Sequence, residues 1–381
     1  MKVKLIDICD FQGGSQPPKD EWKGNYINGY IRMLQIRDFT QKNKVIPEYV
    51  KISNSLKFCE ADDILIARYG ASVGKILTGL SGAYNVAIMK IIPDTTRLNK
   101  RYLKYFLESR SFQDFIKNVG SRAAQAGFNK SDLSSIFIEE RNMNEQNKII
   151  NILDKLTSLI ELKKNQLEKM NLFVKSLFIE MFGDPWINNK NYTIDKLKNY
   201  CILNPLKEKN IKKDELCSFI GMASITENGD INTNNIKKFL EVSKGFTYFL
   251  ENDVLFAKIT PCMENGKGAI AQNLCNGIGA GSTEFHVLRP LTNKSNPYWL
   301  YILTTLKHFR ILAEKNMTGS AGQRRVPISF LENFQLPIPP IELQENFAKK
   351  VQQIDKSKLA IQQSLEQLET LKKSLMQEYF C

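Results

Sequence analysis

Residues 149–181 read IINILDKLTSLIELKKNQLEKMNLFVKSLFIEM, and the spacing of their apolar residues indicates the architecture of the chain. Its seam positions follow one another in steps of four and three residues, and every one except Lys163 is apolar. That spacing is typical of a coiled-coil helix. A helix of about 35 residues is roughly 50 Å long, more than a small domain needs for its own core, so we expect a spacer. The seam consists of Ile149, Leu153, Leu156, Ile160, Lys163, Leu167, Met170, Val174, Leu177 and Met181.

The sequence also marks the two ends of this helix. Asn142 and Glu145 stand three residues apart, as in a capping box. Gly183 and Pro185 follow the seam, and both residue types stop helices. We therefore predict a helix over residues 141–182.

The same seam recurs 198 residues later and keeps its register. One short apolar stripe would more simply be core, but two copies of more than four heptads each favour pairing with each other. Because each helix follows its own globular segment, antiparallel pairing would place these segments at opposite ends, whereas parallel pairing would crowd them. We therefore expect an antiparallel coiled coil. Pro339-Pro340 introduces the second helix, whose seam is Phe347, Val351, Ile354, Lys358, Ile361, Leu365, Leu368, Lys372, Leu375 and Tyr379.

The globular segments before the two helices also form a repeat. Residues 63–68 (DILIAR) align with residues 253–258 (DVLFAK) at an offset of 190, and each pattern predicts a buried strand that ends on a cation. Residues 102–107 match residues 298–303 in apolar spacing, and both segments suit a helix packed on one face.

We therefore predict an α+β fold with pseudo-two-fold symmetry. It contains two repeated α/β domains separated by two long helices that form an antiparallel coiled coil. The expected segments are a first domain at residues 1–140, a first spacer helix at 141–182, a second domain at 183–340 and a second spacer helix at 341–381.

The globular segments carry most of the positive charge. The chain has a formal charge of +13; residues 1–140 hold 21 basic and 15 acidic side chains, and residues 183–340 hold 19 and 14. Basic surfaces attract nucleic acids and release their counterions. Charge alone leaves two interpretations open, a nucleic-acid-binding protein and a basic protein without an anionic partner.

The composition excludes several other classes of protein. With 43% hydrophobic and 24% charged residues, the chain is typical of soluble globular proteins, and no run approaches the roughly 20 apolar residues of a membrane span. No signal peptide is apparent, so we expect a cytoplasmic protein without membrane contact. Seven cysteines without a Cys-x-x-Cys pair and only two histidines predict no disulfide framework, metal site or cofactor.

Four short motifs identify a protein family more specifically than the composition does. They are DILIARYG at 63–70 with Gly74-Lys75, NVAI at 85–88, FGDP at 182–185 and LPIPPIELQ at 336–344. In these motifs the chain closely resembles the specificity subunits of type I restriction–modification systems over essentially its whole length. Residues 139–146 (EERNMNEQ) depart from the family, which usually has a proline-rich lead there. This departure puts the angle at which the first helix begins in doubt.

The resemblance implies a protein that recognises DNA and performs no catalysis. Two target-recognition domains would each read half of a bipartite site in double-stranded DNA. The paired helices would dock methyltransferase subunits, two of them, and restriction subunits would join that core.

Candidate phosphate contacts lie where cations stand beside glycine-rich turns. Glycine lets the backbone approach a phosphate closely, although such charges can also be merely solvated. The expected contacts are Arg68, Lys75, Arg122 and Lys130 in the first domain and Lys258, Lys267, Arg324 and Arg325 in the second. Gln125 and Gln323 lie in the two glycine-rich loops at 120–127 and 319–325, and we expect them to contact DNA as well.

Candidate base contacts lie where polar residues differ between the copies. Residues 31–37 and 220–226 share apolar positions at an offset of 189. Arg can pair with guanine and Gln with adenine, so we expect Arg32, Gln35, Arg37 and Ser224 to contact bases in two different half-sites. The alternative is that they cap loops or solvate a strand. The differing pairs are Arg32 and Gly221, Gln35 and Ser224, and Arg37 and Thr226.

Two other classes of protein compete with DNA recognition. A self-contained methyltransferase needs an Asn/Asp-Pro-Pro-aromatic loop, and Asp184-Pro185-Trp186 and Asn204-Pro205-Leu206 are each incomplete. Residues 264–267 (ENGK) do not match the element of a metal-dependent nuclease. A coiled-coil scaffold with protein-binding lobes fits the basic segments less well, and DNA affinity that is flat across salt would favour it.

Overall fold

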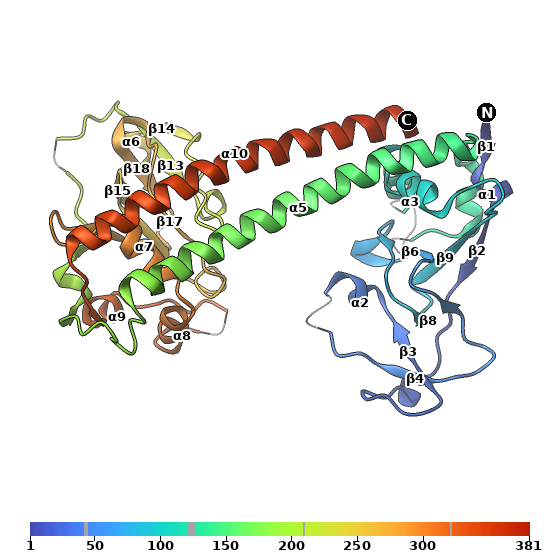
Figure 1. Ribbon diagram of the computed structural model, residues 1–381, viewed down its shortest axis with the longest axis horizontal. Coiled ribbons are helices and arrows are strands. Elements are labelled where there is room, and N and C mark those ends of the chain that lie inside the picture. Colours follow the sequence, from blue (N-terminus) through green and yellow to red (C-terminus); the bar gives the residue numbers. More distant parts are fainter. Residues whose placement is uncertain (42–44, 121–126, 209, 321) are drawn as a thin grey trace. The chain divides into compact units, whose positions relative to one another are not determined.

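The computed structural model describes residues 1–41, 45–120, 127–208, 210–320 and 322–381. The chain divides into two compact units. Unit 1 contains Met1–Leu162 and Ser364–Cys381, and unit 2 contains Lys163–Gln363. Two long helices, α5 (Met143–Phe182) and α10 (Ile341–Phe380), each contribute one half to each unit (Figure 1).

The described residues of unit 1 form two four-stranded sheets and one two-stranded sheet. The first sheet is antiparallel, in the order β2 (Cys9–Gly13), β9 (Ile88–Pro93), β6 (Ile64–Ala67), β7 (Ile76–Leu77). The second has the order β4 (Tyr49–Lys51), β3 (Tyr30–Leu34), β8 (Gly82–Tyr84), β5 (Phe58–Cys59), with β3 and β8 parallel. The third pairs β1 (Lys2–Lys4) with β10 (Phe137–Glu139). The short helices are α1 (Leu5–Ile8), α2 (Ile36–Thr40), α3 (Lys100–Glu108) and α4 (Arg110–Gly120), with 3-10 turns η1 (Lys19–Glu21), η2 (Gly70–Ser72) and η3 (Lys130–Ser135).

Unit 2 repeats this topology strand for strand. Its first sheet has the order β12 (Cys201–Leu203), β19 (Phe285–Pro290), β16 (Val254–Ala257), β17 (Gly268–Ile270). Its second has the order β14 (Ile236–Lys238), β13 (Leu216–Ile220), β18 (Ile278–Gly281), β15 (Thr247–Leu250), with β13 and β18 parallel. Its third pairs β11 (Ile194–Lys196) with β20 (Gln335–Pro337). The short helices are α6 (Phe239–Val242), α7 (Pro297–Thr305), α8 (Lys307–Lys315) and α9 (Ile328–Asn333), with 3-10 turns η4 (Leu197–Asn199), η5 (Met222–Ser224) and η6 (Cys275–Gly277).

The predicted α+β repeat is therefore confirmed. Strands β6 and β16 lie within the two segments expected to be buried strands, and all eight residues of these strands are buried. Helices α3 and α7 cover the expected helical segments. A second helix that the sequence did not predict, α4 or α8, follows each of them.

The long helices confirm the heptad pattern. Every residue of both predicted seams is buried or half-buried. The capping pair before α5 forms, since the Glu145 amide donates to Asn142 Oδ1 at 2.9 Å and the Asn142 amide donates to the Glu145 carboxylate at 3.3 Å. Gly183 ends α5 with a φ of +78°.

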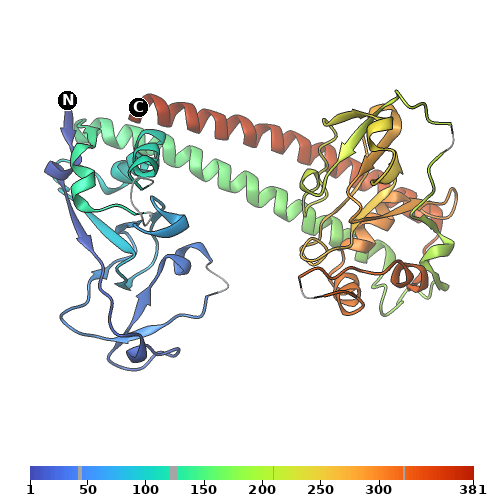
Figure 2. The same ribbon diagram turned by 180° about the vertical axis from the view of Figure 1, so that it is seen from behind.

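Contacts within each unit show that the helices run in opposite directions. In unit 1, Phe380 at the end of α10 shares a core with Ile149 near the start of α5. In unit 2, the Phe178 and Phe182 rings at the end of α5 lie 5.7 and 5.2 Å from the Phe347 ring near the start of α10. There the first part of α10 lies beside the last part of α5 in both views (Figures 1 and 2). The antiparallel expectation is confirmed.

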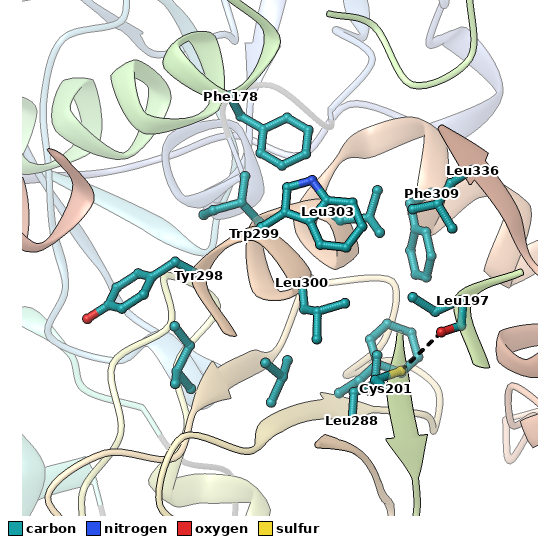
Figure 3. Close-up of a cluster of buried hydrophobic side chains, with 14 of the residues drawn as sticks. Phe178, Leu197, Cys201, Leu288, Tyr298, Trp299, Leu300, Leu303, Phe309 and Leu336 are labelled. Carbon is teal, nitrogen blue, oxygen red and sulfur yellow. Dashed lines mark hydrogen bonds between the residues drawn. The ribbon is translucent and has the colours of Figure 1, made fainter. Parts of the chain in front are cut away.

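In each unit, the first sheet packs against two short helices, α3 and α4 in unit 1 and α7 and α8 in unit 2. In unit 2, the indole of Trp299 lies between Phe178 and other apolar side chains (Figure 3). The N-caps Asn99 and Asn296 align the two helices at an offset of 197, one residue more than the sequence comparison used, so Tyr102 occupies the place of Trp299 in unit 1. Burial of such a side chain contributes roughly 1.5–3 kcal/mol. These cores hold the strand ends from which the candidate loops emerge.

A buried glutamine ties each long helix to its unit. Gln146 of α5 is completely buried; its Oε1 accepts from the Asn99 amide at 2.8 Å, and its Nε2 donates to the carbonyls of Arg97 and Arg141 at 2.7 and 2.8 Å. Gln344 of α10 makes the equivalent three bonds to Asn296, Lys294 and Pro339. Gln146 is the last residue of the segment that departs from the family, and it forms the same contacts in unit 1 as Gln344 forms in unit 2.

No helix in the part of the chain that the structure describes is long and apolar enough to cross a membrane.

Candidate nucleic-acid interface

Equivalent loops follow β6 and β16. Each loop returns through a glycine with positive φ, Gly74 at +82° and Gly266 at +88°, and the next residue is a lysine. The Ala67 amide donates to the Lys75 carbonyl at 3.0 Å, and the Ala257 amide donates to that of Lys267 at 3.3 Å. Lys75 is exposed, whereas Lys267 is half-buried and donates to the Met222 carbonyl at 3.2 Å.

The cation at the end of each of these strands is held within its unit. Arg68 donates from Nε to the Phe128 carbonyl at 3.3 Å and from its terminal nitrogen to Asn129 Oδ1 at 2.7 Å. Lys258 is half-buried, and burial lowers its pKa while nearby Glu284 acts in the opposite direction. Lys130 is exposed and pairs with the exposed Asp10 carboxylate at 2.7 Å.

The second glycine-rich loop lies beside the β16 loop. Arg325 forms β-bridges with both Ile259 and Thr318. Its guanidinium makes a two-point pair with Glu284, at 2.9 and 2.8 Å, and this pair lowers the pKa of the carboxyl group. Arg324 lies farther from its carboxylate partners, 3.7 Å from Glu264 and 3.9 Å from Glu314. Gln323 is exposed.

In unit 1, a bridge between Tyr69 and Gly127 joins the corresponding two segments. Arg122 and Gln125 lie outside the described residues. Each unit therefore brings the loop after β6 or β16 together with the end of the glycine-rich segment, a neighbourhood that the sequence did not predict.

The three residues of the first unit that we expected to contact bases are bound to carboxylates. Arg32 donates to the buried Asp38 at 2.7 Å. Gln35 Nε2 donates to Glu48 at 2.8 Å, and Arg37 pairs with the same carboxylate. Asp38 and Glu48 are thus neighbours that the sequence comparison missed.

Glu48 binds several of the surrounding polar side chains. Lys19 also pairs with it, at 2.7 Å. Burial acts to raise the pKa of Glu48, but the hydrogen bonds from Lys19 and Gln35 and the charge of Arg37 outweigh it, and the pKa is lowered. An ionised carboxylate only accepts hydrogen bonds, so it fixes the Gln35 amide nitrogen toward itself. In unit 2, Ser224 lies half-buried at the end of η5.

The buried histidine of unit 2, His286, forms hydrogen bonds that connect parts of the fold. His286 Nε2 lies 2.8 Å from the Val326 carbonyl, so this nitrogen carries the proton and donates it; Nδ1 lies 3.2 Å from the Asn204 amide nitrogen and accepts. Burial lowers the pKa of His286 to about 4. The ring is therefore neutral near pH 7 and links β19 to the segment after the glycine-rich loop. Within the described ranges, no group of three His, Cys, Asp or Glu side chains could hold a metal ion.

Comparison with known proteins gives a consistent result. A family model described as the type I restriction modification DNA specificity domain matches residues 1–172 and 186–370. The EcoEI specificity subunit of Escherichia coli is 41% identical over 145 residues, 38% of this chain and 24% of that protein. The EcoAI specificity subunit of the same species is 42% identical over 153 residues, 40% of this chain and 26% of that one. The chain thus matches about a quarter of the length of these two relatives.

More distant relatives match nearly the whole chain. The MjaVIII specificity subunit of Methanocaldococcus jannaschii is 21% identical over 396 residues, covering 98% of this chain and 90% of that protein. A solved structure from a study of complex assembly in a type I restriction–modification system is 16% identical, with a TM-score of 0.55 over 100% of this chain and 97% of that one. The specificity subunit of M. genitalium is 14% identical, with a TM-score of 0.53 over 100% and 96%. The two structures share the fold.

Proposed function

Because this chain belongs to the family of type I restriction–modification DNA specificity proteins, we propose that it recognises a bipartite sequence in double-stranded DNA. Residues 1–140 and 183–340 serve as two target-recognition domains, one for each half-site, and residues 141–182 and 341–381 serve as spacer helices. One observation carries the proposal: two units of identical strand order present equivalent Gly–Lys loops, while the polar residues of segments 31–37 and 220–226 differ. Identical scaffolds with different polar residues fit two different half-sites.

The proposed contacts divide into two kinds. Phosphates bind the cations beside the glycine turns and position the DNA, whereas base edges are read by side chains that differ between the units. Arg32, Gln35 and Arg37 reach bases by exchanging Asp38 and Glu48 for the DNA, and Ser224 is their counterpart in unit 2. Gln125 and Gln323 contact DNA from the glycine-rich loops. The proposed phosphate contacts are Arg68, Lys75, Arg122, Lys130, Lys258, Lys267, Arg324 and Arg325.

Sequencing of methylated adenines in a host with and without this gene tests the proposal. We expect a two-part methylated motif only when the gene is present. Arg37→Ser should change the bases of one half of that motif and leave the other half intact, because Arg37 belongs to one unit. Thr226→Ala is the matched variant in unit 2 and should affect only the other half. A shift in both halves caused by Arg37→Ser alone would contradict the assignment of one half-site to each domain.

In this proposal, the partner subunits carry out the methylation and cleavage of DNA. Two methyltransferase subunits dock on the long helices, and restriction subunits join them. Apolar side chains on the outer faces of α5 support this: Leu159 and Leu162 in unit 1 are 45% and 63% exposed, and Leu172 and Phe173 in unit 2 are 57% and 55% exposed. Large exposed apolar groups that recur along one helix are typical of protein interfaces.

Leu162→Glu should weaken the association with methyltransferase subunits by about ten- to a hundredfold, since a charge in an apolar interface remains unpaired. Copurification of the coexpressed subunits measures this effect. The control is Asn165→Glu, which adds the same charge at an exposed polar position of α5. Unchanged copurification of a folded Leu162→Glu variant would exclude this face as the docking surface.

A further inference from the structure

Arg310 of α8 is a buried cation that has no carboxylate partner among the described residues. It is 7% exposed, and its guanidinium lies 4.6 Å from the centre of the Phe256 ring. Burial lowers its pKa to about 10, so it is protonated near neutral pH. Burial of an unpaired charge is costly, and every hydrogen bond that the structure gives this side chain goes to a backbone carbonyl of unit 2.

The four carbonyls belong to two elements. Nε donates to Thr304 in the last turn of α7 at 2.5 Å, where helix carbonyls lack partners and attract positive charge. The terminal nitrogens donate to Met263 at 2.9 Å, Gly266 at 3.3 Å and Lys267 at 3.4 Å, all in the loop after β16. Arg310 thus connects the loop after β16 to the end of α7.

In unit 1, a neutral side chain binds the corresponding loop. Gln113 of α4 stands 197 residues before Arg310, and Leu107 stands 197 residues before Thr304. Gln113 Nε2 donates to the Leu107 carbonyl at 2.7 Å and to the Gly74 carbonyl at 2.9 Å. Both units therefore hold the glycine directly before the loop lysine from the same position of the second helix.

We propose that Arg310 and Gln113 are positioning residues for DNA contact, which act through Lys267 and Lys75. The inference rests on the proposed function, in which these lysines bind phosphates. The loop carbonyls that Arg310 binds flank the backbone of Lys267, whose Nζ in turn contacts the carbonyl of Met222 in η5, the turn that ends at Ser224. Arg310 therefore fixes the phosphate-binding loop and, through it, the turn that carries the candidate base contact of unit 2.

A double-mutant cycle on the full-length chain tests this role, with a random-sequence DNA duplex as the probe because phosphate contacts do not depend on sequence. Lys267→Gln removes one phosphate contact, which should lower the slope of log affinity against log salt by about 0.9 and weaken binding about eightfold at ~0.1 M salt. Arg310→Gln, the residue type used by unit 1, should produce the same change. The double variant should bind no more weakly than Lys267→Gln alone.

The matched pair in unit 1 is Gln113→Ala with Lys75→Gln, for which we expect the same non-additive pattern. Arg310→Lys keeps the charge but not the fork of donors, so it should recover part of the lost slope. If thermal unfolding shows that Arg310→Gln is unfolded at the assay temperature, the cycle is carried out with Arg310→Lys.

The possible outcomes distinguish a failure of the proposed DNA recognition from a failure of the positioning role of Arg310. A wild-type chain whose DNA affinity does not depend on salt contradicts the proposed function itself. Salt-dependent wild-type binding with an unchanged slope in Lys267→Gln or in Arg310→Gln overturns the positioning role. Additive losses in the double variant also overturn it, because they indicate general destabilisation.

Discussion

Gln146→Leu is expected to lower the free energy of unfolding of unit 1 by about 3–5 kcal/mol. Leucine has a similar volume but offers no donor or acceptor, so the Asn99 amide and the carbonyls of Arg97 and Arg141 lose their partner. Each buried polar group left without a hydrogen bond costs roughly 1–3 kcal/mol. The effect is large because a single fully buried side chain satisfies three backbone groups from two segments.

Urea unfolding and hydrogen exchange measure the effect of Gln146→Leu. The Asn99 amide should lose its protection, because Gln146 Oε1 is its acceptor. Gln166→Leu on the exposed surface of α5 is the control and should change stability by less than about 0.5 kcal/mol. Retained protection of the Asn99 amide in Gln146→Leu would mean that the glutamine does not tie α5 to unit 1.

Phe380→Ala should destabilise unit 1 by about 3–5 kcal/mol, because truncation of a buried phenylalanine leaves a cavity. The ring is 9% exposed and lies 5.1 Å from the Tyr102 ring and 6.3 Å from the Phe106 ring. Ser111 Oγ also donates to the Phe380 carbonyl at 2.8 Å, but this backbone contact survives the substitution. The loss should therefore reflect the aromatic packing alone.

Hydrogen exchange resolved by segment locates this loss. Protection should fall in α3, which carries Tyr102 and Phe106, and not in α7 of unit 2. Phe173→Ala, which truncates a phenylalanine that is 55% exposed, is the control and should have little effect. Equal loss in α3 and α7 would show that the end of α10 does not belong specifically to the core of unit 1.

The scaffold could be predicted from the sequence because burial restricts residue type at regular intervals. Strands β6 and β16 are buried along their whole length, so both copies needed apolar residues at the same places. The seams of α5 and α10 repeat for the same reason. The second helix of each pair, α4 or α8, was missed because the comparison followed the first helix directly to the glycine-rich loop.

The candidate site was less predictable because its contacts join residues that no periodicity relates. The pairing of Arg37 with Glu48 joins a helix to the segment just before β4, eleven residues later. Arg310 and Gln113 stand at equivalent positions but differ in type, so a search for matching residues passes over them. A signal was nevertheless present: each stands six residues after a position at the end of the first helix, Thr304 or Leu107, to whose carbonyl it donates.

The division of the chain also fixes the order in which its parts can be completed during synthesis. Unit 2 is one continuous stretch, Lys163–Gln363, whereas unit 1 also requires Ser364–Cys381. A ribosome adds about 5–20 residues per second, so the apolar surface around Tyr102 waits some tens of seconds after its own translation before Phe380 can cover it. Closing so long a loop adds little entropic cost, because that cost grows only with the logarithm of loop length. The part of the protein that is translated first is therefore the last to finish folding, and a nascent chain exposes that unfinished core throughout the translation of the second unit.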